Sequence, residues 1–303
     1  MKRSHTKNSI SGMIFDICNV IFICIMIFVM VYPFWNQLAL SLNEGLDARK
    51  GGIYFWPRKF TLENYSYIIS EGEMLHGLLI SILRVIVGTI TTLFCSGLLA
   101  YITTVRWFSA HRFLRKLFII SFYFSGGMIP VYLLYSKLGL LESFTVYWLP
   151  GLFNTYFMMV LASYMTSLPE ALSESARIDG CNELKIYFRI IMPLCVPVFA
   201  ALAIMSAVGH WNSWFDVMIY NPSGRFDTLQ MKLRNILLEV EQIQKMLKDG
   251  TTGDAAAMQR AQRLTPGSVR AATTMIVTLP IVAIYPFFQQ YFVKGISVGA
   301  VKE

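Results

Sequence analysis

The stretch PEALSESARIDGCNELKIYFRIIMP, residues 169–193, is a charged interruption between two long apolar segments. It predicts a helix, a turn and a second helix. Pro169 suits a first helical turn, and the carboxylates of Glu170 and Glu174 favour the positively polarised end of a helix. Gly180 is typical of a helix end at which the chain reverses. Apolar residues then recur at helical spacing, namely Leu184, Tyr187, Phe188 and Ile191. We therefore expect a charged two-helix knob, residues 169–193.

The rest of the chain is too apolar for an ordinary soluble domain. Of its 303 residues, 55% are apolar and 15% are charged, whereas soluble domains carry about 25% charged residues. The net charge of +8 does not indicate nucleic-acid binding, because the basic residues lie between apolar runs, where they orient spans in a membrane. The five cysteines lack the two-residue spacing of a zinc or redox site and are interpreted as small apolar residues.

Six segments are long and apolar enough to cross a bilayer, which takes about 20 residues. They are residues 13–38, 77–104, 116–137, 143–167, 190–217 and 270–293. The last four contain Pro or Gly, which predicts broken helices around an internal cavity. The expected fold class is an all-α integral membrane protein with six transmembrane helices in a domain of residues 13–293.

Basic residues in the short connections predict the orientation. They favour a cytoplasmic N-terminal tail (1–12), a cytoplasmic C-terminal tail (294–303) and a cytoplasmic loop at 168–192, with outer loops at 44–75 and 218–269. The first apolar run is longer than the core of a signal peptide, so we expect an uncleaved first span.

Within the second outer loop, Leu229–Lys248 has the periodicity of an amphipathic helix. Its apolar face carries Leu233, Ile236, Leu237, Val240, Ile243 and Leu247. Packing on the protein's own surface is the favoured interpretation of this face. Contact with an extracellular partner is the alternative.

The knob resembles the signature of permease subunits in type I ATP-binding-cassette (ABC) importers, which have the MetI-like fold. That signature is Glu-Ala-Ala, three residues, Gly, nine residues, then Ile-x-Leu-Pro. Here Glu174-Ser-Ala176 precedes Gly180, Ile190 follows ten positions later, and Met192-Pro193 ends the motif. Ser for Ala and Met for Leu are mild departures that preserve size or apolarity. The simpler alternative is a positively charged loop with no docking role.

The resemblance implies that the knob seats in a cleft of a cytoplasmic ATPase. It assigns ATPase coupling to Glu174, Ala176, Arg177, Asp179 and Gly180. It also implies a heterodimer with a second homologous permease subunit, two ATPase subunits and an extracellular sugar-binding protein. We expect no cofactor in this chain, because a Gly-rich phosphate loop ending in Lys-Ser or Lys-Thr is absent from the sequence. ATP and Mg²⁺ would be bound by the partner ATPases.

Further resemblance indicates the carbohydrate-uptake, maltose-permease-like branch. Residues 289–302 are similar to its C-terminal tail, residues 56–65 to its first outer loop, and Trp211-Asn212 to its Trp-Asn motif. Residues 125–130 and 209–215 resemble the subgroup that handles complex oligosaccharides, such as those from pectin or alginate. An ABC importer of a non-sugar solute is the alternative function.

Candidate residues for the substrate path follow from sugar chemistry. Trp211 and Trp214 could stack on pyranose faces, and Asn212 could hydrogen-bond to hydroxyl groups. The two Trp side chains could equally form an aromatic belt at the membrane interface. His210 is more often a packing residue than a ligand. Arg84 could meet an acidic sugar, although pairing with a carboxylate or carbonyl of a partner chain is favoured.

Two other function classes are weighed against transport by an ABC importer. A membrane enzyme acting on lipid-linked sugars needs acidic or His residues clustered at one membrane face, and the sequence shows no such cluster, nor a nucleophile with a base at suitable spacing. An ion-coupled secondary transporter typically shows inverted repeats and carboxylates within spans. Asp16 alone gives little support for it.

Overall fold

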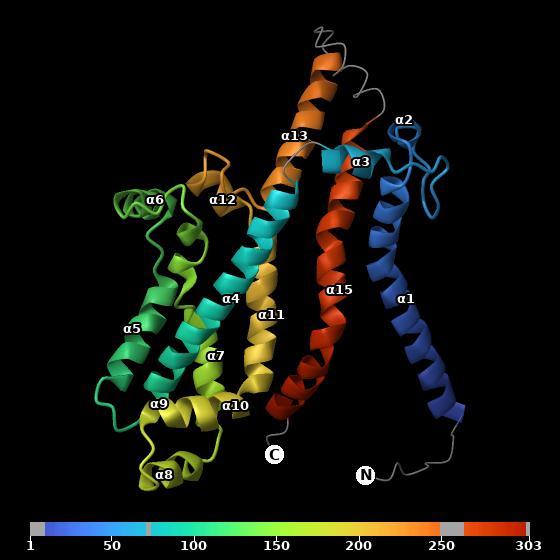
Figure 1. The fold of residues 1–303 in the computed structure, drawn as a ribbon. Coiled ribbons are helices and arrows are strands. Elements are labelled where there is room, and N and C mark those ends of the chain that lie inside the picture. Colours follow the sequence, from blue (N-terminus) through green and yellow to red (C-terminus); the bar gives the residue numbers. More distant parts are fainter. Residues whose placement is uncertain (1–9, 71–73, 249–263, 301–303) are drawn as a thin grey trace. The chain divides into compact units, whose positions relative to one another are not determined.

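The computed structural model describes residues 10–70, 74–248 and 264–300. Within these ranges the regular structure is helical, apart from one isolated antiparallel bridge between Asn43 and Phe60 (Figure 1). The chain divides into two compact units, one made of residues 1–71 and 236–279 and the other of residues 72–235 and 280–303. The second unit carries both candidate sites.

The second unit is a series of long helices joined by short ones. Its elements are α4 (Met74–Thr104), α5 (His111–Tyr123), α6 (Met128–Lys137), two 3₁₀ turns (Phe144–Tyr147 and Leu149–Gly151), α7 (Thr155–Thr166), α8 (Ala171–Ile178), α9 (Glu183–Ile186), a π-helical turn (Tyr187–Ile191), α10 (Met192–Leu194), α11 (Val196–Asn212) and α12 (Phe215–Tyr220). The start of α13 (Leu229–Lys248) also belongs to it.

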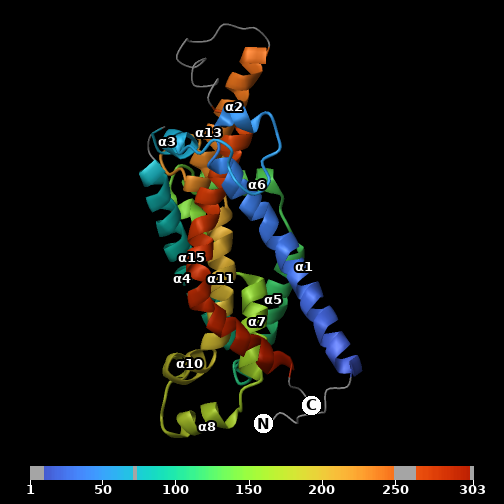
Figure 2. The same ribbon diagram turned by 90° about the vertical axis from the view of Figure 1, so that its right-hand side faces the viewer.

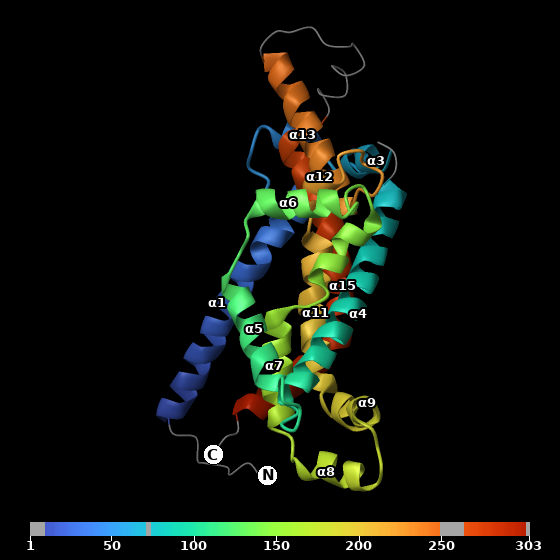
Figure 3. The same cartoon turned by 90° about the vertical axis from the view of Figure 1, so that its left-hand side faces the viewer.

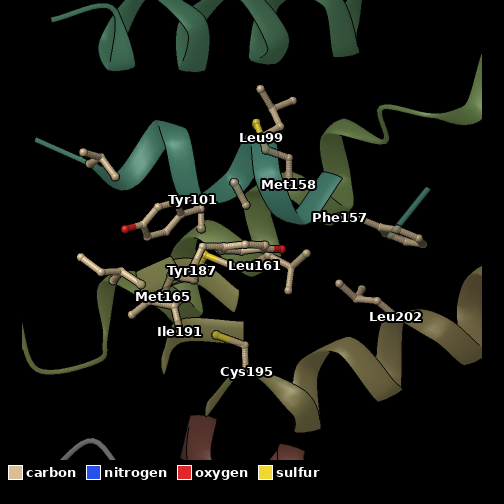
Figure 4. Packing of buried hydrophobic residues seen from close by; sticks show 14 of the residues in the cluster. Leu99, Tyr101, Phe157, Met158, Leu161, Met165, Tyr187, Ile191, Cys195 and Leu202 are labelled. Atoms are coloured by element: carbon tan, nitrogen blue, oxygen red, sulfur yellow. The ribbon is translucent and has the colours of Figure 1, made fainter. Parts of the chain in front are cut away.

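The core of this unit lies where α4 packs against α7 and α11. Leu99, Met158, Leu161 and Leu202 converge there (Figure 4). Small residues on α4 let the helices approach closely, as is usual where membrane helices pack. A Cβ added at Gly97 would lie 2.5 Å from the Tyr187 hydroxyl oxygen.

Three of the six predicted spans are bent rather than continuous. The segment predicted as a single span at 116–137 is two helices, α5 and α6, at 118° to each other, and Figure 3 shows α6 lying across the end of α5. Gly127 makes this turn at a φ of +80°, a conformation that side chains disfavour. The segments at 143–167 and 190–217 bend by 42° and 80°. In the described residues, three helices are long and apolar enough to cross a membrane by themselves. Up to six spans result if each bent helix pair counts as one span.

The first unit holds α1 (Ile10–Ser41), α2 (Gly45–Ala48), α3 (Glu63–Ser70), the remainder of α13 and the first part of α15 (Pro266–Ala300). The apolar side chains of α1 are exposed along most of its length, as expected of a helix that meets lipid or another subunit. Helix α15 continues through Pro280 and Pro286. It also runs to Ala300, so residues 294–300 of the predicted cytoplasmic C-terminal tail are helical.

Helix α13 has the predicted limits, Leu229–Lys248. On its apolar face Leu233, Ile236 and Val240 are at most 7% exposed. This burial supports packing on the protein's own surface. The side chain of Leu247 and residues 249–263 lie outside the described part of the chain.

Candidate functional site

Helix α8, the first helix of the knob (residues 169–193), lies beyond the ends of α4, α7 and α11 (Figures 1, 2 and 3). We call this side the α8 end. Helix α8 begins at Ala171, two residues later than the predicted start at Pro169. It ends at Ile178, and Gly180 follows at a φ of +79°. The Gly180 amide donates to the Arg177 carbonyl (3.0 Å) and the Cys181 amide to the Ala176 carbonyl (2.9 Å).

These two bonds form a Schellman motif, which accounts for the sharp turn predicted at Gly180. The second helix, α9, then begins at Glu183, and Asn182 before it is the N-cap residue, whose side-chain oxygen accepts from the Lys185 amide at 2.9 Å. Both ends of the turn are therefore fixed by local hydrogen bonds. The predicted helix, turn and helix are confirmed.

The knob presents apolar and acidic side chains on its surface. Glu174 and Asp179 are exposed, Ile178 is 86% exposed and Leu184 is 61% exposed. Of the predicted coupling residues, Ala176 points inward and is only 7% exposed. The predicted second apolar stripe is divided, because Tyr187 and Ile191 are buried whereas Leu184 and Phe188 are exposed.

Arg177, predicted to face the ATPase, is engaged within the chain instead. Its Nε donates to the Glu183 carboxylate at 2.7 Å. The same carboxylate accepts from the Tyr101 hydroxyl at 2.5 Å and from the Trp107 indole N–H at 3.3 Å. Burial alone would raise the pKa of Glu183, but the hydrogen bonds from Arg177 and Tyr101 outweigh it and lower the pKa, so the carboxylate is ionised at neutral pH.

Sequence reasoning missed Glu183, Tyr101 and Trp107. Tyr101 and Trp107 belong to a different part of the chain from the knob, and no motif connects them to it. The only local signal was the charge of Glu183 within a segment whose neighbours Ile186 and Tyr187 are apolar.

A second polar cluster lies nearer the opposite end of α4. Arg84 is 3% exposed, forms an ion pair with Asp216, and stacks with its Cζ 4.7 Å from the centre of the Tyr147 ring. Asp216 also accepts from the Ser213 hydroxyl at 2.7 Å and the Val217 amide at 3.0 Å. A buried arginine requires such a partner. Arg84 thus pairs with a carboxylate, as the favoured prediction expected, but this carboxylate belongs to the chain itself and not to a partner chain.

The other predicted substrate-path residues follow one another at the end of α11. The His210 ring packs against α4, since a Cβ added at Gly88 would lie 2.5 Å from its Nε2. Trp211 is 9% exposed. Asn212 is exposed, and Trp214 is 37% exposed with the Arg234 guanidinium 4.5 Å from its ring centre. Asn212 and Trp214 are therefore accessible in this conformation, whereas Trp211 is buried and the His210 ring packs against α4.

Comparison with known proteins decides the family. No protein-family model matches the chain. Over 304 residues it is 36% identical to Protein LplC of Bacillus subtilis, with 100% of both chains covered. It is 31% identical to the permease protein YtcP of a polygalacturonan/rhamnogalacturonan transport system of the same organism, covering 95% of this chain and 98% of YtcP. The chain belongs to the carbohydrate-uptake permease family of ABC importers.

Two further similarities extend this result. The permease is 30% identical to AraQ, an arabinooligosaccharide transport permease of Halalkalibacterium halodurans, over 91% of this chain and 92% of AraQ. Its fold matches a crystal structure of a bacterial ABC transporter involved in the import of the acidic polysaccharide alginate, with a TM-score of 0.80. That match has 22% identity and covers 95% of this chain and 99% of the other. The family predicted from residues 174–193 is confirmed, and the permease is a membrane-embedded transport subunit.

Proposed function

We propose that this permease forms one half of the membrane path through which an importer carries an oligosaccharide into the cell. Its partners are a second, homologous permease subunit, two ATPase subunits that bind ATP and Mg²⁺, and an extracellular sugar-binding protein. Hydrolysis on the ATPases drives the path between outward-open and inward-open states.

The exposed surface of the knob carries this proposal. Glu174 and the apolar side chains of Ile178 and Leu184 project from a segment whose turn is fixed by local hydrogen bonds. Exposed apolar side chains next to an acidic one are typical of a docking surface. We assign ATPase contact to Glu174, Ile178 and Asp179, with Gly180 setting the angle between α8 and α9. Ala176 and Arg177 support the knob from within.

An oligosaccharide is the substrate class that best fits this permease. YtcP is named for transport of polygalacturonan and rhamnogalacturonan, and AraQ for transport of arabinooligosaccharides. At the end of α11, Asn212 and Trp214 offer a hydrogen-bonding amide and an aromatic face, the two groups that sugar recognition uses.

The same proposal includes the topology. Six spans result when each bent helix pair is one span. With the α8 end in the cytoplasm, the basic tails and the Arg106–Lys116 connection lie on the inner side, as the distribution of basic residues requires.

The docking surface is tested by Glu174→Gln and Gly180→Val in the complex of both permease subunits and two ATPases, reconstituted in proteoliposomes. We expect fewer ATPase subunits to copurify and sugar uptake to fall, because a charged contact and the left-handed turn are lost. Glu44→Gln is the matched control, since Glu44 is a partly exposed carboxylate paired with Lys59 at 2.9 Å in the outer loop. Unchanged copurification and uptake in both variants would refute ATPase docking by the knob.

Substrate class is tested separately by uptake of galacturonate oligosaccharides, neutral arabinooligosaccharides and an amino acid. Uptake of either oligosaccharide, competed by the unlabelled sugar, supports the assignment. Uptake of the amino acid alone would refute it.

A further inference from the structure

We propose that Glu183 is a positioning residue that links α8 to α4 and so transmits movement of the ATPases to the membrane path. This inference rests on the docking proposed above. It concerns a residue that faces inward, away from the surface assigned to the ATPase.

Donors from three different elements converge on the Glu183 carboxylate. Glu183 is the first residue of α9. Of its donors, Arg177 lies in α8, Tyr101 lies near the end of α4, and Trp107 lies in the connection after α4. All three donors reach the Glu183 oxygens within 2.5–3.3 Å. A carboxylate with two oxygens can accept all of these bonds at once, and hydrogen bonds to an ionised acceptor are roughly twice as strong as neutral ones.

Helix α8 makes few other contacts with the ends of α4 and α7. Ala176 is the one buried side chain of α8. A cavity of about 280 Å³ lies between α8 and the ends of α4 and α7, lined by Tyr101, Trp107, Met165, Glu170 and Arg177 among others. The ion pair between Arg106 and Glu170 spans 3.4 Å, but its side chains are 77% and 55% exposed, so water screens it. Apolar contact between α8 and the ends of these helices therefore rests on Ala176, which belongs to the core cluster, and the polar link through Glu183 adds to it.

Helix α4 is packed closely against its neighbours on the other side of the Glu183–Tyr101 hydrogen bond. Tyr101 packs on Tyr187 with ring centres 5.2 Å apart, and both belong to the core cluster (Figure 4). Close approaches at Gly88 and Gly97 fix α4 against α11 and the turn after α9. A displacement of Tyr101 must therefore move α4 with its neighbours.

Helix α4 also carries Arg84, which forms the second polar cluster with Asp216. At about 1.5 Å per residue, Arg84 lies about 25 Å along α4 from Tyr101. Arg84 holds Asp216, which follows the exposed Trp214. Helix α4 thus joins the α8 end, through Tyr101 and Glu183, to the segment proposed to face the sugar.

The test uses the complete importer in proteoliposomes and three variants. Glu183→Gln removes the charge, Tyr101→Phe removes only the hydroxyl that connects α4, and the third combines both. Glu44→Gln is the control, because Glu44 is 31% exposed against 28% for Glu183 and its pair with Lys59 touches neither the knob nor α4. Copurification of the ATPases and sugar transported per ATP hydrolysed are both measured.

We expect each single variant to retain its ATPases and to transport about tenfold less sugar per ATP, because a hydrogen bond to a charged group is worth about that factor. The double variant should be no worse than the stronger single variant, since both remove the same link. Tyr101→Phe keeps the Arg177–Glu183 bond, so it tests the link to α4 even if Glu183→Gln fails to fold.

Unchanged sugar transported per ATP in Tyr101→Phe would overturn the inference, and so would strictly additive losses in the double variant. Neither result would touch the docking proposal, which is judged by Glu174→Gln and ATPase copurification. Conversely, if Glu174→Gln has no effect while Tyr101→Phe uncouples transport, docking by Glu174 fails and the link through Glu183 stands.

Discussion

Replacing Asp216 by Asn should destabilise the permease more than removing Arg84 itself. The pair is asymmetric, because the Arg84 side chain is 3% exposed and the Asp216 side chain is 27% exposed. Asp216→Asn leaves a positive charge buried without its counter-ion. Arg84→Met removes that charge and leaves a carboxylate that water, the Ser213 hydroxyl and the Val217 amide still stabilise.

The magnitude follows from the burial of each partner. Breaking a fully buried ion pair costs about 3 to 5 kcal/mol. Partial exposure of the Asp216 side chain reduces this cost for Asp216→Asn. Arg84→Met also loses the cation–π contact with the Tyr147 ring, 4.7 Å from the Arg84 Cζ, which is worth about 1 kcal/mol. We therefore expect Asp216→Asn to cost about 2 kcal/mol and Arg84→Met about 1 kcal/mol. At about 2 to 4 °C per kcal/mol for a chain of a few hundred residues, Asp216→Asn lowers the Tm by about 4 to 8 °C.

The assay is thermal unfolding of the purified complex in detergent, followed by a signal of this subunit, for both single variants and for Arg84→Met with Asp216→Asn. The double variant should be more stable than Asp216→Asn alone, because the unpaired buried charge is gone. Glu241→Gln serves as a control that breaks an ion pair in which both side chains are exposed, with Arg270 62% and Glu241 39% exposed. The reasoning is refuted if Asp216→Asn is the milder single variant or if the double variant is the least stable.

Three further outcomes are expected. Gly97→Ala should lower stability by about 1 to 3 kcal/mol in thermal unfolding, because its Cβ would meet the Tyr187 hydroxyl at 2.5 Å and the Phe199 ring at 2.8 Å. Gly180→Ala should cost about 1 kcal/mol from left-handed backbone strain alone, since its Cβ meets nothing within 4 Å. The lowered pKa of Glu183 stabilises the fold above its unfolded pKa, so Tm should be constant between about pH 5 and 8 and fall at lower pH, less steeply in Glu183→Gln.

Each of these outcomes has a contrary result. Equal stability of Gly97→Ala and the parent protein would contradict the close helix approach. A cost for Gly180→Ala well above about 2 kcal/mol would exceed left-handed backbone strain and would indicate contacts at Gly180 that the structure lacks. An acid transition of Tm unaltered by Glu183→Gln would assign that transition to other carboxylates.

The sequence alone determined the family, the helical class and the form of the knob. Apolar segments of about 20 residues identify spans because burying a backbone in lipid requires helices. The turn at Gly180 was predictable because left-handed backbone favours glycine wherever it occurs. The limits of α13 were predictable because its apolar spacing is a property of consecutive residues.

Tertiary structure decided the bends and the polar links. Ser125-Gly-Gly127 allows a turn, but only the packed chain sets the 118° between α5 and α6. The pairs Arg84–Asp216 and Tyr101–Glu183 are 132 and 82 residues apart in sequence. Hydropathy and turn preference depend on neighbours along the chain, whereas an ion pair depends on where whole helices lie. For that reason the knob could be recognised from its sequence, while its connection to α4 required the fold.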